Sequence, residues 1–256
     1  MKSIHTIAAA VALCVTGIAP AMAQSTTFTN GNFGTPTASL TAWTTAGDVV
    51  VAGSKKVAVM STASVDFEDD FPLQAGFNNN SGTAAVDFFN AADLGGVPVT
   101  SLDIGGYAYE GSAIRQDFYA TAGSTLTVSF DWAFLSSDTA NPDFGFLAIN
   151  NSVVNFVDTN SSVLNSQFNG TFGDLNNVTW GWNTASFSYT ANANGAVSLV
   201  LGVVDIGDMG GTSELRVDNV AVTSAPVPEP ETYAMMLAGL GMLGGAVRRR
   251  RQGKAA

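Results

Sequence analysis

Cysteine and histidine are almost absent from this chain of 256 residues. The one cysteine is Cys14 and the one histidine is His5, and both lie within the first 23 residues. The rest of the chain therefore has no side chain for a disulfide, a thiol nucleophile, a Cys/His zinc site or a Ser–His–Asp triad. Because these absences exclude several common catalytic and redox classes, we expect the protein not to be an enzyme.

Positive charge is also scarce. Between residues 24 and 225 there are four basic residues and nineteen acidic ones, so this segment carries a formal charge of −15. Such a charge repels phosphate backbones and anionic membrane surfaces, and it favours solubility. We therefore expect no nucleic-acid partner.

Residues 1–23 have the pattern of a secretory signal peptide. Lys2 gives the basic start, an apolar run follows at 7–18, and Ala21 and Ala23 are the small residues that signal peptidase reads. The apolar run is too short to span a hydrocarbon core of roughly 30 Å, which argues against an uncleaved anchor. We expect a signal helix here and cleavage after Ala23.

Three unlike elements follow one another near the C-terminal end. In order, they are the motif Pro228, Glu229 and Pro230, the apolar run 233–247, and the cluster Arg248, Arg249, Arg250 and Arg251. The apolar run predicts a short transmembrane helix, although it is shorter than the ~20 residues that most spans need. The arginines hold their side in the cytoplasm, so residues 252–256 form a cytoplasmic tail end and the body lies outside.

Residues 226–251 resemble the PEP-CTERM sorting signal of Gram-negative bacteria, because all three elements occur in the order which that signal requires. The resemblance implies processing near Pro228–Pro230 by the membrane protease exosortase. It also implies an inner-membrane intermediate with the body in the periplasm, followed by the cell surface or the extracellular matrix of a biofilm. The alternative is a single-span anchor that is never cut.

The body, residues 24–225, reads as all-β, because short runs of Val, Phe, Thr and Tyr alternate with turn residues and no long helical periodicity occurs. The run 125–134 alternates most regularly, with five large apolar residues on one face. About ten strands favour a two-sheet antiparallel sandwich of the jelly-roll type. Two successive small β domains are the alternative, but no linker divides the body.

Candidate strands cover most of the body. They are 48–52, 57–60, 84–89, 103–109, 113–120, 125–134, 144–149, 153–157, 185–190, 197–203 and 215–222. In the last of these the alternation changes parity, and a β-bulge at Asp218-Asn219 would restore it.

The body also resembles carbohydrate-binding-module-like jelly rolls. The residues that carry this resemblance are Asn30-Gly31-Asn32-Phe33, Leu40-Thr41-Ala42-Trp43 and Leu215-Arg216-Val217-Asp218-Asn219-Val220. In many members an acid follows the first motif and holds a structural calcium ion together with the Asp of the last strand. Gly34 stands in place of that acid here.

Calcium is the one metal ion that the sequence suggests, because it prefers oxygen ligands. The candidate ligands are Asp205, Asp208 and Asp218. Two further acidic groups are candidates, the run 66–70 and the pair Asp138 with Asp143. A solvated charged surface is the alternative for each group.

Trp180 and Trp182 are candidates for a sugar-binding platform, because they are two residues apart and asparagines lie beside them. Tyr107 and Tyr109 form a similar pair. Aromatics at this spacing also occur in hydrophobic cores, where we place Trp43 and Trp132.

These patterns predict an exported structural or adhesive protein of the cell surface or extracellular matrix. A specific carbohydrate-binding module is the alternative, and a glycoside hydrolase with two carboxylates is a remote one. The expected partners are signal peptidase, exosortase and extracellular polysaccharide, with transient contact to the inner membrane through the C-terminal span. No cofactor is expected other than a possible calcium ion.

Overall fold

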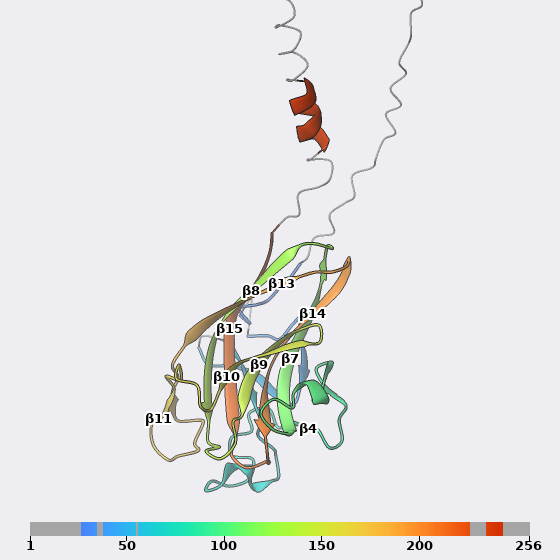
Figure 1. Cartoon of the computed structure of the whole chain (residues 1–256). Coiled ribbons are helices and arrows are strands. Elements are labelled where there is room, and N and C mark those ends of the chain that lie inside the picture. Colours follow the sequence, from blue (N-terminus) through green and yellow to red (C-terminus); the bar gives the residue numbers. More distant parts are fainter. Residues whose placement is uncertain (1–26, 35–37, 55, 226–233, 243–256) are drawn as a thin grey trace, which may run out of the picture.

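A computed structural model describes residues 27–34, 38–54, 56–225 and 234–242. Two antiparallel sheets pack face to face over most of this region (Figure 1). The main strands are β1 (Thr44–Ala46), β2 (Asp48–Ala52), β3 (Val57–Ser61), β7 (Ala108–Ala120), β8 (Thr125–Ser136), β9 (Phe144–Ile149), β10 (Ser152–Asp158), β13 (Asn183–Thr190), β14 (Gly195–Ile206) and β15 (Ser213–Ala225).

Sheet I has the order β1-β7-β14-β9-β10, and the short strand β4 (Val86–Asp87) also pairs with β7. Sheet II has the order β13-β8-β15-β3-β2. Successive long strands change sheet, as β7 to β8, β8 to β9, β13 to β14 and β14 to β15 do. The predicted all-β, two-sheet antiparallel sandwich of the jelly-roll type is therefore confirmed.

Smaller elements lie in the connections. They are the β-strand pairs β5 (Asp93–Leu94) with β6 (Val97–Pro98) and β11 (Gln167–Phe168) with β12 (Val178–Thr179), and the 3-10 helices η1 (Glu68–Asp70) and η2 (Val99–Ser101). A short helix also covers residues 234–242.

The space between the sheets holds the main core. The predicted inward face of β8 is buried there, with Leu126, Phe130 and Trp132 among its members. They meet apolar residues of sheet I such as Ile114 and Leu199. The alternation that predicts this strand from sequence is therefore confirmed, and Trp43 and Trp132 are core residues as expected.

The outer faces of the two sheets differ. A second apolar cluster, which includes Leu94, Val97 and Leu102 from the 88–106 segment, covers the outer face of sheet I. Every residue of β9 is consequently buried. The outer face of sheet II is more open, since β13 alternates between half-buried and exposed residues along its whole length. A ligand surface on a sheet face is therefore available on sheet II.

Three details of the sequence prediction are tested directly. The bulge in β15 is confirmed, because the register against β8 shifts between Asp218 and Ala221. The predicted strand 103–109 is wrong, because residues 102–106 form a turn and bends after η2 and β7 begins only at Ala108. The predicted strand 84–89 shortens to the two residues of β4.

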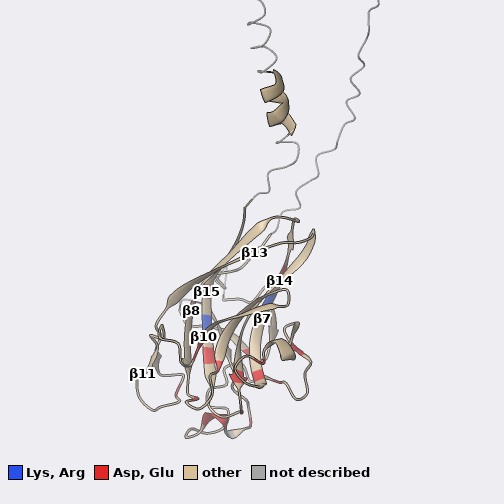
Figure 2. Ribbon diagram, in the orientation of Figure 1, with Lys and Arg blue, Asp and Glu red and all other residues tan. Residues whose placement is uncertain are grey.

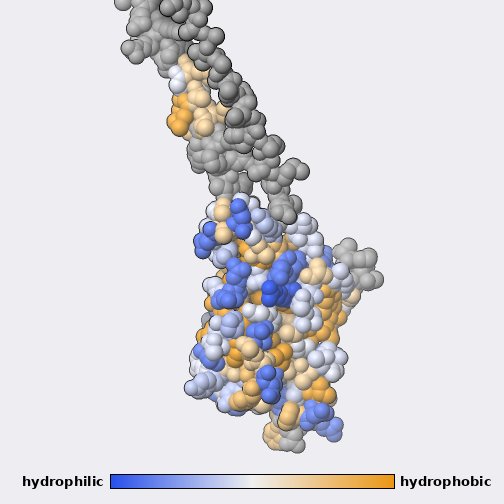
Figure 3. Space-filling view, turned by 90° about the vertical axis from the view of Figure 1, so that its right-hand side faces the viewer, coloured by the Kyte–Doolittle hydropathy of each residue, from blue (hydrophilic) through white to orange (hydrophobic). Residues whose placement is uncertain are grey.

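The C-terminal helix at 234–242 lies inside the expected apolar span, and its methionine and leucine side chains are exposed (Figure 3). No helix within the described residues is long and apolar enough to cross a membrane. The signal helix expected at 1–23 and the ends of the expected span lie outside the described residues.

Candidate functional site

An open cleft of about 390 Å³ lies on the outer face of sheet II. Its lining residues are Asp131, Trp182, Asp218 and Asn219. They come from three neighbouring elements, because Asp131 of β8 is the cross-strand partner of both Asp218 in β15 and Thr184 in β13. The cleft therefore combines a half-buried indole ring with two carboxylates and an amide, which are groups that recognise hydroxyl-rich ligands.

Hydrogen bonds fix the base of the cleft. Thr184 Oγ1 donates to Asp131 Oδ1 at 2.6 Å, and Asn219 Nδ2 donates to Asp131 Oδ2 at 2.8 Å. Asn219 has a φ of 52°, as expected for the extra residue of a bulge. The bulge thus brings Asn219 beside Asp131, and both oxygens of Asp131 accept a hydrogen bond.

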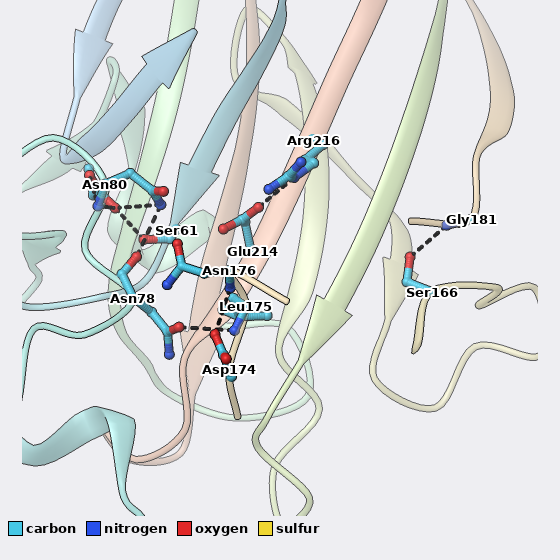
Figure 4. A network of polar contacts seen from close by, with 11 residues as sticks. Ser61, Asn78, Asn80, Ser166, Asp174, Leu175, Asn176, Gly181, Glu214 and Arg216 are labelled. Carbon is cyan, nitrogen blue, oxygen red and sulfur yellow. Dashed lines mark hydrogen bonds and ion pairs between the residues drawn. The ribbon is translucent and has the colours of Figure 1, made fainter. Parts of the chain in front are cut away.

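Trp180 lies on the same outer face, but one side of its ring is covered. The Arg216 guanidinium carbon is 4.0 Å from the centre of the indole ring, which is a cation–π contact. Arg216 Nε also donates to Glu214 Oε1 at 2.6 Å (Figure 4). Arg216 therefore holds the ring of Trp180 in place, whereas the ring of Trp182 lines the cleft.

Glu214 is almost fully buried beneath this contact. Burial raises its pKa, and the neighbouring charge of Arg216 opposes part of that rise. Arg216 and Glu214 form an ion pair, so the positive charge of Arg216 is offset by Glu214 and not by the two carboxylates of the cleft.

The segment before β13 is also held in place. The Gly181 backbone N–H donates to Ser166 Oγ at 3.1 Å (Figure 4), and Asn183 Nδ2 donates to the Val163 carbonyl at 3.2 Å. A side chain at Gly181 would collide with Asn165. The two tryptophans therefore sit on a chain segment whose backbone is closely packed.

The second aromatic pair lies elsewhere. Tyr107 is 78% exposed, and Tyr109 makes an edge contact with Phe89 at 5.2 Å between ring centres. Neither lines the cleft.

The three residues predicted as calcium ligands do not share one site. Asp205 is buried between the sheets, Asp208 is exposed and accepts a hydrogen bond from Asn141 at 2.7 Å, and Asp218 lines the cleft. Among the residues that the structure describes, no three acidic side chains lie together in a way that could hold a metal ion. The predicted grouping of Asp218 with Asp205 and Asp208 is thus not formed, because Asp218 faces outward on the other sheet.

The acidic run 66–70 is only partly the solvated loop that its sequence suggests. Asp66 is exposed, whereas Asp69 and Asp70 are buried. Asp70 accepts hydrogen bonds from the Asn78 backbone N–H and side-chain amide and from the Thr212 hydroxyl. Glu110, which sequence analysis did not single out, is also buried. The sequence contains one indication that Glu110 is buried. Glu110 has the same parity as the apolar residues of the strand that follows, so it lies on the same side of the sheet as they do.

The expected sorting and cleavage residues lie outside the described residues. They are Ala21, Ala23, Pro228, Glu229, Pro230, Arg248, Arg249, Arg250 and Arg251.

No curated protein matches the chain. Solved structures similar to it include carbohydrate-binding modules, as the sequence resemblance predicts. One, described as "CBM4 structure and function", is 10% identical, with 73% of this chain and 96% of that chain covered and a TM-score of 0.34.

Another is TmCBM61 in complex with beta-1,4-galactotriose, which is 16% identical, with 78% of this chain and 99% of that chain covered and a TM-score of 0.36. A family 35 carbohydrate binding module from an environmental isolate is 18% identical, with 46% and 73% covered and a TM-score of 0.23. The two-sheet architecture follows from the strand pairing of this chain and does not depend on these similarities.

Residues 226–251 match the family described as the PEP-CTERM protein-sorting motif, which confirms the resemblance found in the sequence. This motif indicates an exported protein that exosortase processes at the membrane. The C-terminal region of the chain is thus a PEP-CTERM sorting motif.

Proposed function

We propose that the protein is an adhesive component of the cell surface or extracellular matrix, and that its sandwich binds a polysaccharide in the cleft of Trp182. Signal peptidase removes residues 1–23, exosortase removes the C-terminal signal near Pro228–Pro230, and residues 24–225 remain as the mature body. The observation that carries the proposal of binding is the placement of Trp182 beside Asp131, Asp218 and Asn219 in one open cleft.

The charge of the cleft narrows the ligand class. Two carboxylates line it, and Arg216 is engaged by Glu214. An anionic polymer would be repelled there, whereas hydroxyl groups of a neutral polysaccharide can donate hydrogen bonds to the carboxylates. We therefore expect a neutral or amino-substituted polysaccharide.

Binding fits the cleft better than hydrolysis. A glycosidase of the two-carboxylate type needs one carboxylic acid that can donate a proton. Both oxygens of Asp131 are already engaged as acceptors, by the Thr184 hydroxyl and the Asn219 amide. Asp131 is therefore held in place as an acceptor that can also bind a ligand hydroxyl, and neither oxygen is free to present a proton to a glycosidic bond.

A glycan array probed with the full-length chain in mild detergent tests this function. We expect retention on neutral polysaccharides, and a loss of about five- to tenfold in affinity for Trp182→Ala, since one stacked aromatic contributes on the order of 1–1.5 kcal/mol. Tyr107→Ala is the matched control, because it removes an exposed aromatic that does not line the cleft. Equal binding by Trp182→Ala and the wild type would refute the cleft as the binding site.

A further inference from the structure

The edges of the two sheets differ in how well they are protected against pairing with another chain. Sheet I ends in β1 and β10, and sheet II ends in β13 and β2. An edge strand presents a row of backbone groups that have no partner within the sheet, so native proteins keep such strands short, irregular or charged, or cover them.

Three of these edges follow this rule. Strand β1 has only three residues, and β10 has an irregular register against β9 and ends at Asp158. Strand β2 begins at Asp48, whose carboxylate accepts hydrogen bonds from the backbone N–H groups of Asn80 and Ser81. The loop of Asn80 and Ser81 is therefore fixed to the start of β2.

Strand β13 is the exception. Its eight residues pair with β8 without any shift in register, and they include no glycine, proline or charged residue. Within the described part of the chain, no backbone hydrogen bond other than those of the sheet reaches residues 184–190. Strand β13 is therefore a long, regular and uncharged edge that is open to a further strand.

The side chains of β13 alternate in a way that fits a second copy of the same strand. The exposed side chains all carry hydroxyl groups, whereas those that face the main core are apolar or aromatic. The exposed set is Thr184, Ser186, Ser188 and Thr190, and the inward set is Ala185, Phe187 and Tyr189. In an antiparallel pair of identical strands, hydroxyl residues would lie opposite hydroxyl residues, and such cross-strand pairs are favourable.

Apolar side chains lie beside this edge. The ring centres of Phe187 in β13 and Phe156 in β10 are 6.4 Å apart, so the two edge strands run along the same side of the sandwich. Both rings are only half-buried, and Val154 of β10 is 38% exposed. A second copy on this side would remove apolar surface from water as well as pair the strand.

The charge of the body also favours this edge for self-association. Residues 24–225 carry a formal charge of −15, so most contacts between two copies would bring carboxylates together. Figure 2 shows that the acidic residues gather toward the lower end of the sandwich, whereas β13 near the upper end carries none. Two copies can therefore meet along β13 without placing like charges opposite each other.

We propose that two copies of the chain associate by antiparallel pairing of their β13 strands, which joins the two copies of sheet II into one continuous sheet. The pairing is isologous, because each copy supplies the same surface to the other. It does not depend on polysaccharide binding, so either property can exist without the other.

The arrangement has a consequence for the cleft of Trp182. Trp182 directly precedes β13, so the two clefts would lie near opposite ends of the joined strands, about 27 Å apart for eight residues at about 3.4 Å each. Both clefts would be on the outer face of the same sheet. One polymer could then contact both clefts, and binding through two linked sites is tighter than through one.

Light scattering of the full-length chain in mild detergent, corrected for the bound detergent, tests the proposal. A loading concentration of about 100 µM suits an interface built on a single strand, which is small for a protein interface. We expect two chains per particle for the wild type. We expect one chain for Ser186→Glu combined with Ser188→Glu, because like charges would then face each other across the pair.

The matched control is Ala221→Glu combined with Thr223→Glu. Both positions are exposed on the outer face of sheet II, but β15 lies inside the sheet, so the charge changes equally while the edge is unaltered. This control should remain dimeric. Circular dichroism of both double variants verifies that each remains folded.

Oxidative crosslinking gives a second readout. In a Cys14→Ser background, Ser186→Cys combined with Ser188→Cys should form a dimer linked by disulfides, because opposite residues of paired antiparallel strands have Cα atoms within disulfide range. Ala221→Cys combined with Thr223→Cys in the same background should not.

Three results would overturn the proposal. A monomeric wild type at this concentration would show that the edge does not pair. Dimers that persist in the folded Ser186→Glu, Ser188→Glu variant would place the contact elsewhere, for instance in the C-terminal apolar span. Loss of the dimer in the control as well would place the contact on the face of sheet II and not on its edge.

Discussion

At the scale of single residues, Arg216 connects the candidate site to a buried charge. Its guanidinium group stacks on Trp180 and pairs with Glu214, whose side chain is only 2% exposed. Removing Arg216 would leave a buried carboxylate without its counter-charge, which is more costly than losing an exposed ion pair.

We predict that Arg216→Ala lowers the free energy of unfolding by about 2–4 kcal/mol. The matched control is Arg115→Ala, which breaks the exposed pair with Asp117 and should change it by about 0.5 kcal/mol or less. Urea unfolding monitored by tryptophan fluorescence measures both. Similar losses in the two variants would contradict the role assigned to Glu214 burial.

At the scale of elements, the first described segment, residues 27–34, packs against the bulge of β15. Val220 N–H donates to the Gly31 carbonyl at 2.8 Å, and a side chain at Gly31 would collide with the Val220 carbonyl. Phe33 is fully buried and packs against Trp43 at 5.5 Å between ring centres. The close approach explains why glycine stands at position 31.

We therefore expect Gly31→Ala to destabilise the fold by about 1–3 kcal/mol, as overpacking does in other cores. Gly195→Ala is the control, because a Cβ there meets no atom within 4 Å. Thermal unfolding of the two variants gives the comparison. A Gly31→Ala variant as stable as Gly195→Ala would show that the backbone at this contact can shift at little cost in free energy.

Much of the fold could be predicted from local patterns. The strands at 48–52 and 144–149 coincide with β2 and β9, and the parity change in the last strand predicts its bulge. The prediction of a strand at 103–109 was wrong, because the backbone turns at Gly105, where φ is 85°. A glycine in a turn cannot be distinguished by alternation alone from a glycine in a strand.

The sites were harder to predict than the strands. The shared spacing of Trp180 and Trp182 indicates one face, but the stacking of Arg216 on Trp180 joins β15 to the segment before β13, and these are distant in sequence. The placing of the buried Glu110, Asp205 and Asp143 side by side likewise depends on the register of β7, β14 and β9. Sequence patterns report which face a residue occupies, and cross-strand neighbours follow only from the pairing.

At the scale of the whole molecule, the uneven distribution of charge affects stability. Burial raises the pKa of Glu110 to about 8 and that of Asp69 to about 6, above the ordinary values near 4. Between pH 4 and pH 8 the folded chain therefore holds more protons than the unfolded chain. The stability that these groups contribute is fully present below pH 4 and is lost as the pH rises through their raised pKa values.

We predict that the free energy of unfolding falls between pH 5 and pH 8, by up to about 1.4 kcal/mol per pH unit for each such group. Glu110→Gln removes one of these groups and should have a shallower slope. Urea titrations at several pH values measure this difference. Identical slopes in the variant and the wild type would show that Glu110 titrates normally.

Export and processing are a second property of the whole chain. Mass spectrometry of the exported fraction should find a chain that begins at Gln24 and lacks the arginine cluster. The expected reasons are cleavage after Ala23 and removal of the sorting signal that residues 226–251 form. An intact C-terminus in the mature protein would contradict exosortase processing and leave the single-span anchor.

Retention of the processed protein in the extracellular matrix is the most direct test of the account. Cells producing the wild type or Trp182→Ala are fractionated into matrix and free supernatant, and the processed chain is quantified in each. We predict equal export and processing of the two proteins, with the wild type held in the matrix and the variant shifted to the supernatant. Retention of Trp182→Ala to the same extent as the wild type would contradict polysaccharide binding by the cleft.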